Sequence, residues 1–204
     1  MLEDLVIELK LRGMSPRTVK TYLYHNQRFL DFIKKQPTDI TKQDIRLYLA
    51  EQMDKISLAT LALIESALRF FYDGILKKDI MTDIKGPKHE RKLPVVLTPD
   101  EVIHLIDAAP TQKSRLLLQM LYGSGLRVSE ATNLKVIDIE LDQKIGWVRR
   151  GKGAKDRLII ISDGIIKELR NYIKNYEETY LFSKEKPLSS RSVQQMIKRV
   201  AEKA

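Results

Sequence analysis

Two short basic motifs carry the residues of this chain that are best suited to chemistry on a phosphate. The first is Gly123-Ser124-Gly125-Leu126-Arg127-Val128-Ser129-Glu130, and the second is Gly151-Lys152-Gly153-Ala154-Lys155-Asp156-Arg157. In the first motif, glycines permit a close backbone approach, and the planar guanidinium of Arg127 can bind two phosphate oxygens at once. In the second, two glycines favour a tight hairpin that carries Lys152 and Lys155 near its tip. Together the motifs indicate an active site for a phosphodiester.

Each motif also has an interpretation without catalysis. Arg127 lies three residues before Glu130, a spacing that favours an ion pair, so this arginine could simply brace the start of a helix. The basic hairpin could be an ordinary charged turn. Taken separately, the motifs leave both alternatives open, because a single Gly-x-Gly turn is a weak signal.

The composition excludes several classes of protein. The chain has 204 residues, 43% of them hydrophobic, no cysteine and three scattered histidines. Disulfides, thiolate metal sites and a cysteine nucleophile are therefore excluded, and we expect no metal and no cofactor. No apolar run approaches the roughly 20 residues that a membrane helix needs, and the amino terminus opens with acidic residues. We expect a cytoplasmic protein without a membrane partner.

The net charge of +9 is unevenly distributed. Residues 1–86 hold 14 Lys and Arg against 12 Asp and Glu, whereas the remainder holds 22 against 15. The basic excess is concentrated in three clusters: 85–92, 149–157 and 184–203. One cluster alone could be a solvated face, but three in one half of the chain favour a polyanionic partner, above all a nucleic acid.

Hydrophobic spacing predicts helices almost throughout residues 1–84. Leu2, Leu5, Val6 and Leu9 fall on one helical face, and Ser15, Thr41 and Ser57 are expected to cap the three helices that follow. The expected buried positions of the second and fourth helices are Val19, Tyr22, Leu23, Phe29, Leu30 and Ile33, then Leu61, Ile64, Leu68, Phe71 and Ile75. These patterns predict a compact four-helix unit.

Residues 85–95, with Gly86, Pro87 and Pro94 around a charged run, are predicted to be a linker. A second unit over 96–204 starts with the capping box Thr98-Pro99-Asp100-Glu101. We expect helices over 112–122, after Arg127, around 166–176 and from Ser190 onward. Alternating residues predict a hairpin over 145–150 and 157–161, and a short strand over 180–182.

In their order along the chain, these motifs resemble the tyrosine site-specific recombinases, and among them the Xer-type recombinases and related integrases. Gly13-Met14-Ser15-Pro16-Arg17-Thr18 resembles the opening helices of the family's core-binding domain, and Leu93-Pro94-Val95-Val96-Leu97-Thr98 resembles the entry to its catalytic domain. The resemblance implies a multidomain fold: an all-α, SAM-like, four-helix core-binding domain over 1–84, and a truncated, mostly helical α+β catalytic domain with a small antiparallel sheet over 96–204.

The resemblance implies site-specific DNA recombination, in which a tyrosine attacks a DNA phosphate and forms a 3′-phosphotyrosyl intermediate. Arg127 would stabilise charge on the phosphoryl oxygens, Lys152 in preference to Lys155 would protonate the leaving 5′-oxygen, and Glu130 would orient Arg127. The residues expected to bind DNA are Arg149, Arg150, Lys155, Arg157, Lys88, Arg91 and Lys92. The implied partners are double-stranded DNA and, in the full-length protein, further copies in a tetrameric synapse, with Xer-type chromosome dimer resolution as the expected role.

The family also has a His-x-x-Arg motif and a tyrosine nucleophile beyond the hairpin, and the sequence after Arg157 shows neither. His25-Asn26-Gln27-Arg28 has the right letters but lies in an early helix ahead of Arg127, so we interpret it as structural. Tyr22, Tyr72, Tyr172 and Tyr176 lie on or beside apolar stripes, and Tyr122 precedes Arg127. We expect these 204 residues to bind DNA without cleaving it. The alternatives are a non-catalytic DNA-binding module, a phage or plasmid integrase fragment, or an RNA-binding helical protein, which the motif order disfavours.

Overall fold

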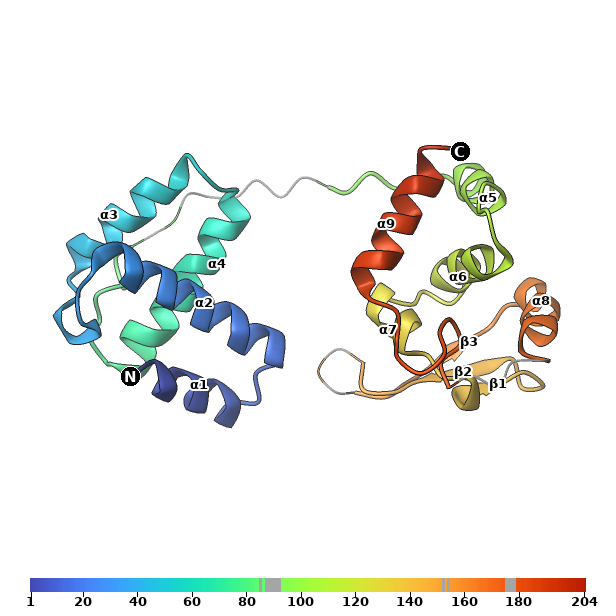
Figure 1. Ribbon diagram of the computed structural model, residues 1–204, viewed down its shortest axis with the longest axis horizontal. Helices are drawn as coiled ribbons and strands as arrows, with labels where there is room; N and C mark the ends of the chain where they lie inside the picture. The colour runs from blue at the N-terminus through green and yellow to red at the C-terminus, as the bar shows by residue number, and fades with distance from the viewer. Residues whose placement is uncertain (85, 87–92, 152, 154, 175–178) are drawn as a thin grey trace. The chain divides into compact units, whose positions relative to one another are not determined.

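The computed structural model describes residues 1–84, 86, 93–151, 153, 155–174 and 179–204. The chain divides into two compact units, Met1–Leu93 and Pro94–Ala204 (Figure 1). Most of the expected linker, residues 85 and 87–92, lies outside the described residues. Each unit has its own hydrophobic core, so each is described separately.

The first unit contains the four predicted helices, and three of them begin at the predicted caps. They are α1 (Leu2–Leu11), α2 (Pro16–Ile33), α3 (Lys42–Met53) and α4 (Leu58–Arg69), with a short 3-10 helix at Pro37–Asp39. The hydroxyl oxygens of Ser15, Thr41 and Ser57 each accept a hydrogen bond from the backbone N–H three residues on. Such caps satisfy donors that the first turn of a helix leaves unpaired.

The core of this unit draws buried residues from all four helices and differs in two respects from the predicted stripes. Phe29 is fully buried, but the other predicted positions on α2 are half-buried, and Asn26 is fully buried instead. Its amide can be buried because Nδ2 donates to the carbonyl oxygens of Tyr22 and Ala67, which joins α2 to α4. In addition, the predicted fourth helix continues as a π-helix over Phe70–Ile75, in which Phe71 is buried as predicted and Tyr72 is buried as well.

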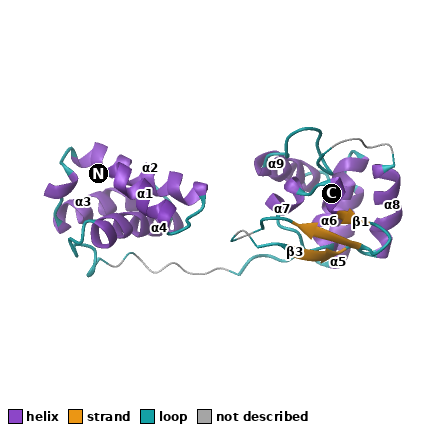
Figure 2. Ribbon diagram, turned by 90° about the horizontal axis from the view of Figure 1, so that it is seen from below, coloured by secondary structure: helices purple, strands orange, loops and turns teal. Residues whose placement is uncertain are grey.

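The second unit is mostly helical and carries the sheet (Figure 2). Its helices are α5 (Pro99–Asp107), α6 (Gln112–Gly123), α7 (Val128–Asn133), α8 (Asp163–Ile173) and α9 (Ser190–Ala201), with a 3-10 helix at Val136–Asp138. The predicted capping box at α5 is present: the Thr98 N–H donates to Glu101 Oε2 at 2.7 Å, and the Glu101 N–H donates to Thr98 Oγ1 at 3.3 Å. The predicted fold class is confirmed.

The sheet is antiparallel, with strand order β1-β2-β3. Its strands are β1 (Ile139–Glu140), β2 (Ile145–Val148) and β3 (Arg157–Ile160). The β2–β3 hairpin is the one predicted, with Val148 opposite Arg157, whereas β1 was not predicted because two residues give no alternating pattern. The predicted strand over 180–182 is not part of the sheet. Tyr180 forms isolated bridges with Lys135 and Ser183, and Leu181 and Phe182 are buried in the core.

The core of the second unit holds residues next to both predicted motifs. Leu116, Leu117 and Met120 of α6 pack with Val148 and Ile159 of the hairpin in one buried cluster. The helix α6 ends at Gly123, where an added Cβ would lie 3.0 Å from Ile165 Cδ1 of α8, so glycine permits this close packing. The turn after α6 and the base of the hairpin are therefore both anchored in the same core.

Two kinds of feature are absent from the described residues. No helix among them is both long and apolar enough to cross a membrane. Within the same part of the chain, no three His, Cys, Asp or Glu side chains gather in a way that could hold a metal ion.

Candidate active site

The first motif forms a tight turn that places Arg127 at the start of α7. Gly125 has a φ of 58°, a left-handed conformation that glycine adopts at little cost. Leu126 is buried and anchors the turn in the core. The backbone N–H of Arg127 donates to Glu130 Oε2 at 3.0 Å, so the carboxylate of Glu130 caps its own helix. The sequence from Gly125 to Glu130 thus folds as one local unit.

The carboxylate of Glu130 lies between two guanidinium groups. Arg127 Nη1 donates to Oε1 at 2.7 Å, and Arg157 Nη2 donates to Oε2 at 2.6 Å. Arg157 Nη2 also lies 3.3 Å from the carbonyl oxygen of Gly125 and donates to it. The Glu130 side chain is 3% exposed, against 57% for Arg127 and 37% for Arg157. One buried carboxylate therefore holds two partly exposed arginines.

The protonation state of Glu130 follows from this geometry. Burial alone would raise the pKa of the carboxyl group, but the hydrogen bonds from Arg157, from the Arg127 backbone and from the Arg127 side chain outweigh burial and lower the pKa to about 2. Glu130 is therefore ionised at neutral pH. With one negative and two positive groups, the cluster has a net charge of +1. Arg127 is the more exposed of its two arginines.

The base of the predicted hairpin lies directly against this cluster. Gly151 donates its N–H to the carbonyl oxygen of Lys155 at 2.9 Å, which closes the hairpin base. A Cβ added at Gly151 would lie 3.3 Å from Glu130 Oε1 and 3.1 Å from Lys155 O, so any larger residue would crowd Glu130 and the hairpin backbone. The structure thus brings the two sequence motifs together at Glu130. Lys152 itself lies outside the described residues, as do Lys88, Arg91 and Lys92.

The basic residues predicted to bind DNA differ in their surroundings. Arg149 stacks on the Trp147 ring, with its guanidinium carbon 4.9 Å from the ring centroid. It also donates to Asp138 and Asp156, at 3.1 Å in each case. The Arg150 backbone N–H donates to Asp156, and hydrogen bonds from Arg150 and then Arg149 lower the pKa of Asp156.

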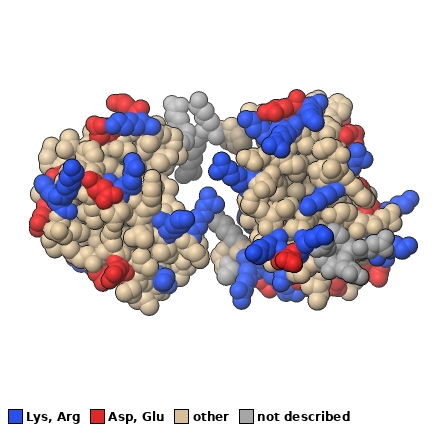
Figure 3. Space-filling view, viewed as in Figure 1, with Lys and Arg blue, Asp and Glu red and all other residues tan. Residues whose placement is uncertain are grey.

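The side chains of Arg150 and Lys155 are exposed, whereas the charge of Arg149 is already compensated. Figure 3 shows further lysine and arginine side chains on the visible faces of both units.

The His-x-x-Arg letters at 25–28 include two buried residues, His25 and Asn26. They lie within α2 in the first unit, whereas Arg127 belongs to the second. His25 is 9% exposed, and burial, together with the nearby charge of Arg28, lowers its pKa. Tyr72 is fully buried, and Tyr22 and Tyr172 pack on the cores of their units, as expected, while Tyr176 lies outside the described residues.

Sequence reasoning missed three partners of this site. They are Asp138, Trp147 and the carbonyl oxygen of Gly125, which contact the two arginines that flank the hairpin. The separation of Arg157 from Glu130 is 27 residues, so no helical or strand spacing connects them. The sequence places Arg157 only at the start of a strand beside a glycine turn. That position is equally consistent with a contact to Glu130 and with a contact to DNA.

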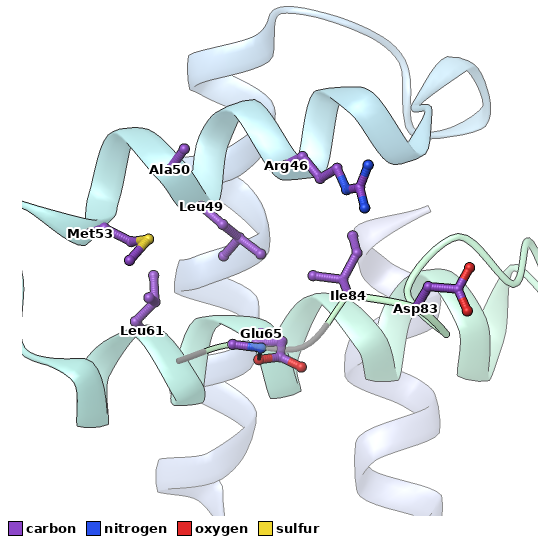
Figure 4. A pocket seen from close by; sticks show the side chains of 9 residues that line it. Arg46, Leu49, Ala50, Met53, Leu61, Glu65, Asp83 and Ile84 are labelled. Carbon is purple, nitrogen blue, oxygen red and sulfur yellow. Dashed lines mark hydrogen bonds between the residues drawn. The ribbon is translucent and has the colours of Figure 1, made fainter. Parts of the chain in front are cut away.

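Two surface hollows lie apart from this cluster. A cavity of about 270 Å³ in the first unit lies between α3 and α4, where Leu49 and Leu61 form an apolar wall and Arg46, Glu65 and Asp83 lie at the rim (Figure 4). A second hollow, of about 630 Å³, is lined by Pro110, by residues of α9, and by Glu202 and Lys203 directly after it. Neither of these two linings includes Arg127, Glu130 or Arg157.

Comparisons with known proteins cover the whole chain. Residues 95–204 match the Phage integrase family, and residues 1–82 match the Phage integrase, N-terminal SAM-like domain. The chain is 35% identical to tyrosine recombinase XerA of Thermococcus kodakarensis, over 100% of this chain and 74% of that protein. It is 32% identical to XerA of Pyrococcus horikoshii, over 100% of this chain and 73% of the relative.

Solved structures give the same result. A crystal structure of XerA recombinase is 30% identical, covers 99% of this chain and 75% of its own, and has a TM-score of 0.50. A lambda integrase dimer bound to a core site is 20% identical, covers 98% of this chain and 79% of its own, and has a TM-score of 0.78, which shows a shared fold. From its two matched domains and its similarity to XerA over the full chain, this protein belongs to the phage integrase family, as a Xer-like tyrosine recombinase.

Proposed function

We propose that this chain binds and activates a DNA phosphodiester in Xer-type site-specific recombination, with chromosome dimer resolution as its role. The match to archaeal XerA proteins along the whole chain supports the Xer assignment. In the reaction that the family resemblance implies, the oxygen of a tyrosine that we do not assign to these 204 residues forms a bond to phosphorus while the bond from phosphorus to the 5′-oxygen breaks. The 5′-oxygen takes up a proton, and a 5′-hydroxyl of another strand later reverses the step.

Arg127 is the residue that we assign to the phosphoryl oxygens, and its support from Glu130 is the observation that carries the proposal. Of the guanidinium nitrogens of Arg127, Nη1 donates to Glu130, and the others make no hydrogen bond within the described chain. The Arg127 side chain is 57% exposed. A fork held at one end and open at the other can donate to an anion. Loss of such a donor typically costs a hundredfold or more in rate, roughly 3 kcal/mol.

Lys152 is our candidate for the proton donor to the 5′-oxygen, with Lys155 as the alternative. The support is the position of Gly151, the residue before Lys152, against Glu130 Oε1. We assign the exposed Arg150 and Lys155, with Lys88, Arg91 and Lys92, to the DNA backbone. Since Arg149 already bonds two carboxylates, we assign it first to holding the hairpin and only second to DNA.

The proposal includes the domain organisation and the partners. Residues 1–84 would be the core-binding domain, 85–95 the linker and 96–204 part of the catalytic domain, acting on double-stranded DNA in the cytoplasm within a tetrameric synapse. The structural relatives include a lambda integrase tetramer bound to a Holliday junction, which supports an oligomer on DNA. No tyrosine of the chain follows a His-x-x-Arg motif after the hairpin, so we propose that these 204 residues bind DNA without cleaving it.

The test measures whether Arg127 contacts one particular phosphate. A duplex selected from a random pool for binding to the chain is resynthesised with single neutral methylphosphonates, one position at a time. Fluorescence anisotropy then gives the dissociation constants for the wild type, Arg127→Ala and the control Arg170→Ala, whose guanidinium pairs with the exposed Asp142.

One phosphate should show a neutralisation penalty on the order of ten- to a hundredfold in the wild type and the control, and none in Arg127→Ala. If the effects of Arg127→Ala and of phosphate neutralisation on the binding free energy add at every phosphate, Arg127 contacts none of them and only braces α7.

A further inference from the structure

We propose that Arg157 is a positioning residue for Arg127, acting through the carboxylate of Glu130, and not a contact to DNA. The inference rests on the proposed role of Arg127 as the phosphate donor. It concerns how that donor is kept in place and how its charge is kept available.

The two carboxylate oxygens of Glu130 accept different sets of hydrogen bonds. Oε1 accepts from the Arg127 guanidinium, and Oε2 accepts from the Arg127 backbone N–H and from Arg157 Nη2. Both oxygens are thus fixed, so the carboxylate cannot rotate without breaking a charged hydrogen bond. Because Arg157 Nη2 also donates to the Gly125 carbonyl oxygen, one nitrogen ties both ends of the Gly125–Glu130 segment to β3.

The balance of charge gives Arg157 a second effect. A carboxylate that is 3% exposed needs compensation by partners. If Arg127 were its single partner, the pair would be neutral, and Arg127 would offer little net attraction to a phosphate. With Arg157 present, the three groups together carry one positive charge, and Arg127 is the more exposed of the two arginines.

The position of Arg157 disfavours a direct contact with DNA. Its Nη2 is already engaged by Glu130 and Gly125, and its Nε is buried without a hydrogen-bond partner in the described chain. It begins β3 opposite Val148, at the foot of the hairpin that Gly151 and Lys155 close. Arg157 therefore joins the two motifs of the site, the arginine turn and the basic hairpin.

The experiment compares Arg157→Met, Arg157→Lys and the control Arg170→Met in the 204-residue chain. Methionine removes the charge, whereas lysine restores a donor that can replace Nη2, the one nitrogen of Arg157 that bonds Glu130. The first readout is the pKa of Glu130 from the carboxyl ¹³C shift in NMR titrations. The second is the penalty for neutralising the single phosphate that couples to Arg127, measured by anisotropy as above.

We expect Arg157→Met to raise the pKa of Glu130 from about 2 toward its ordinary value and to lower the phosphate penalty about tenfold. Arg157→Lys should keep a lowered pKa and most of the penalty, and Arg170→Met should match the wild type in both. An unchanged pKa or an unchanged penalty in Arg157→Met overturns the inference. So does equally weaker binding to native and neutralised duplexes, which would identify a direct DNA contact.

Two further outcomes are separable. If Arg157→Met does not fold, Arg157→Lys decides by itself, since a lysine variant that loses either the lowered pKa or the penalty contradicts the inference. If the wild type shows no phosphate coupled to Arg127, the proposed function fails. The titration of Glu130 then still reports whether Arg157 holds the carboxylate.

Discussion

Replacing Glu130 by glutamine should destabilise the second unit in a way that depends on pH. In the native state the pKa of Glu130 is about 2, against an ordinary value of 4.5. Each unit of difference corresponds to about 1.4 kcal/mol, so the ionised carboxylate adds on the order of 3 kcal/mol to the free energy of unfolding at neutral pH. Because the native pKa is the lower one, this contribution is complete above pH 4.5 and is lost as the pH falls toward 2.

The chain provides a selective probe for this measurement. Trp147 is its one tryptophan and lies in β2 of the second unit, so tryptophan fluorescence follows the unfolding of that unit alone. Urea unfolding of the wild type and Glu130→Gln, at several values between pH 7 and pH 2.5, gives both free energies of unfolding. The difference should be roughly 2–3 kcal/mol at pH 7 and should shrink steadily below about pH 4.5.

The outcome that would refute this reasoning is specific. A difference below about 0.5 kcal/mol at pH 7 would be typical of an exposed ion pair, and it would contradict a buried carboxylate with three charged or backbone partners. A difference of about 3 kcal/mol that stays constant down to pH 2.5 would point to packing and not to charge. Arg170→Met, which removes an exposed pair with Asp142, serves as the control and should change stability by less than about 0.5 kcal/mol.

Three further predictions concern other parts of the chain. Asp44→Asn should destabilise the first unit by about 1 kcal/mol at pH 7, after allowance for the half-exposed Lys35, as followed by circular dichroism of its helices. The reason is that Lys35 and the Thr41 backbone lower the pKa of Asp44 to about 2, so the stabilisation is lost as the pH falls below 3.8. In Asp44→Asn, the unfolding transition seen in Trp147 fluorescence should not change. Gly125→Ala should lower the stability of the second unit by about 1 kcal/mol because of its φ of 58°, whereas Gly164→Ala, which meets open space in α8, should be neutral or stabilising in the same urea assay. Arg150→Gln should reduce the slope of log binding constant against log salt by about 0.9 for any duplex, and an unchanged slope in anisotropy titrations would remove Arg150 from the DNA interface.

The helices and the hairpin could be predicted because their signals are local. Each predicted helix cap is a hydrogen bond between residues three apart, so a short stretch of sequence contains both partners. The capping residues are Ser15, Thr41, Ser57 and Thr98. The β2–β3 hairpin follows from alternation around a glycine turn. By contrast, the burial of Asn26 depends on how α2 packs on α4, which no local pattern encodes. The apolar spacing at 70–75 also did not distinguish the π-helix from a continued α-helix.

The candidate site divides in the same way. By itself, the sequence determined that Arg127 and Glu130 are neighbours at the start of a helix and that a basic hairpin follows them, since both are matters of spacing. Only the tertiary structure decided which of the hairpin's basic residues shares that carboxylate. Arg157 is joined to Glu130, while Arg149 is joined to Asp138 and Asp156. These pairs span 27, 11 and 7 residues. Arg149 meets Asp138 and Asp156 through the pairing of β2 with β1 and β3, whereas Arg157 meets Glu130 because α6, α7 and the hairpin share one core. The charge of an arginine does not by itself select its partner. For Arg149 and Arg157, the partner is selected by the burial of Glu130 and by the direction in which the strands place each side chain.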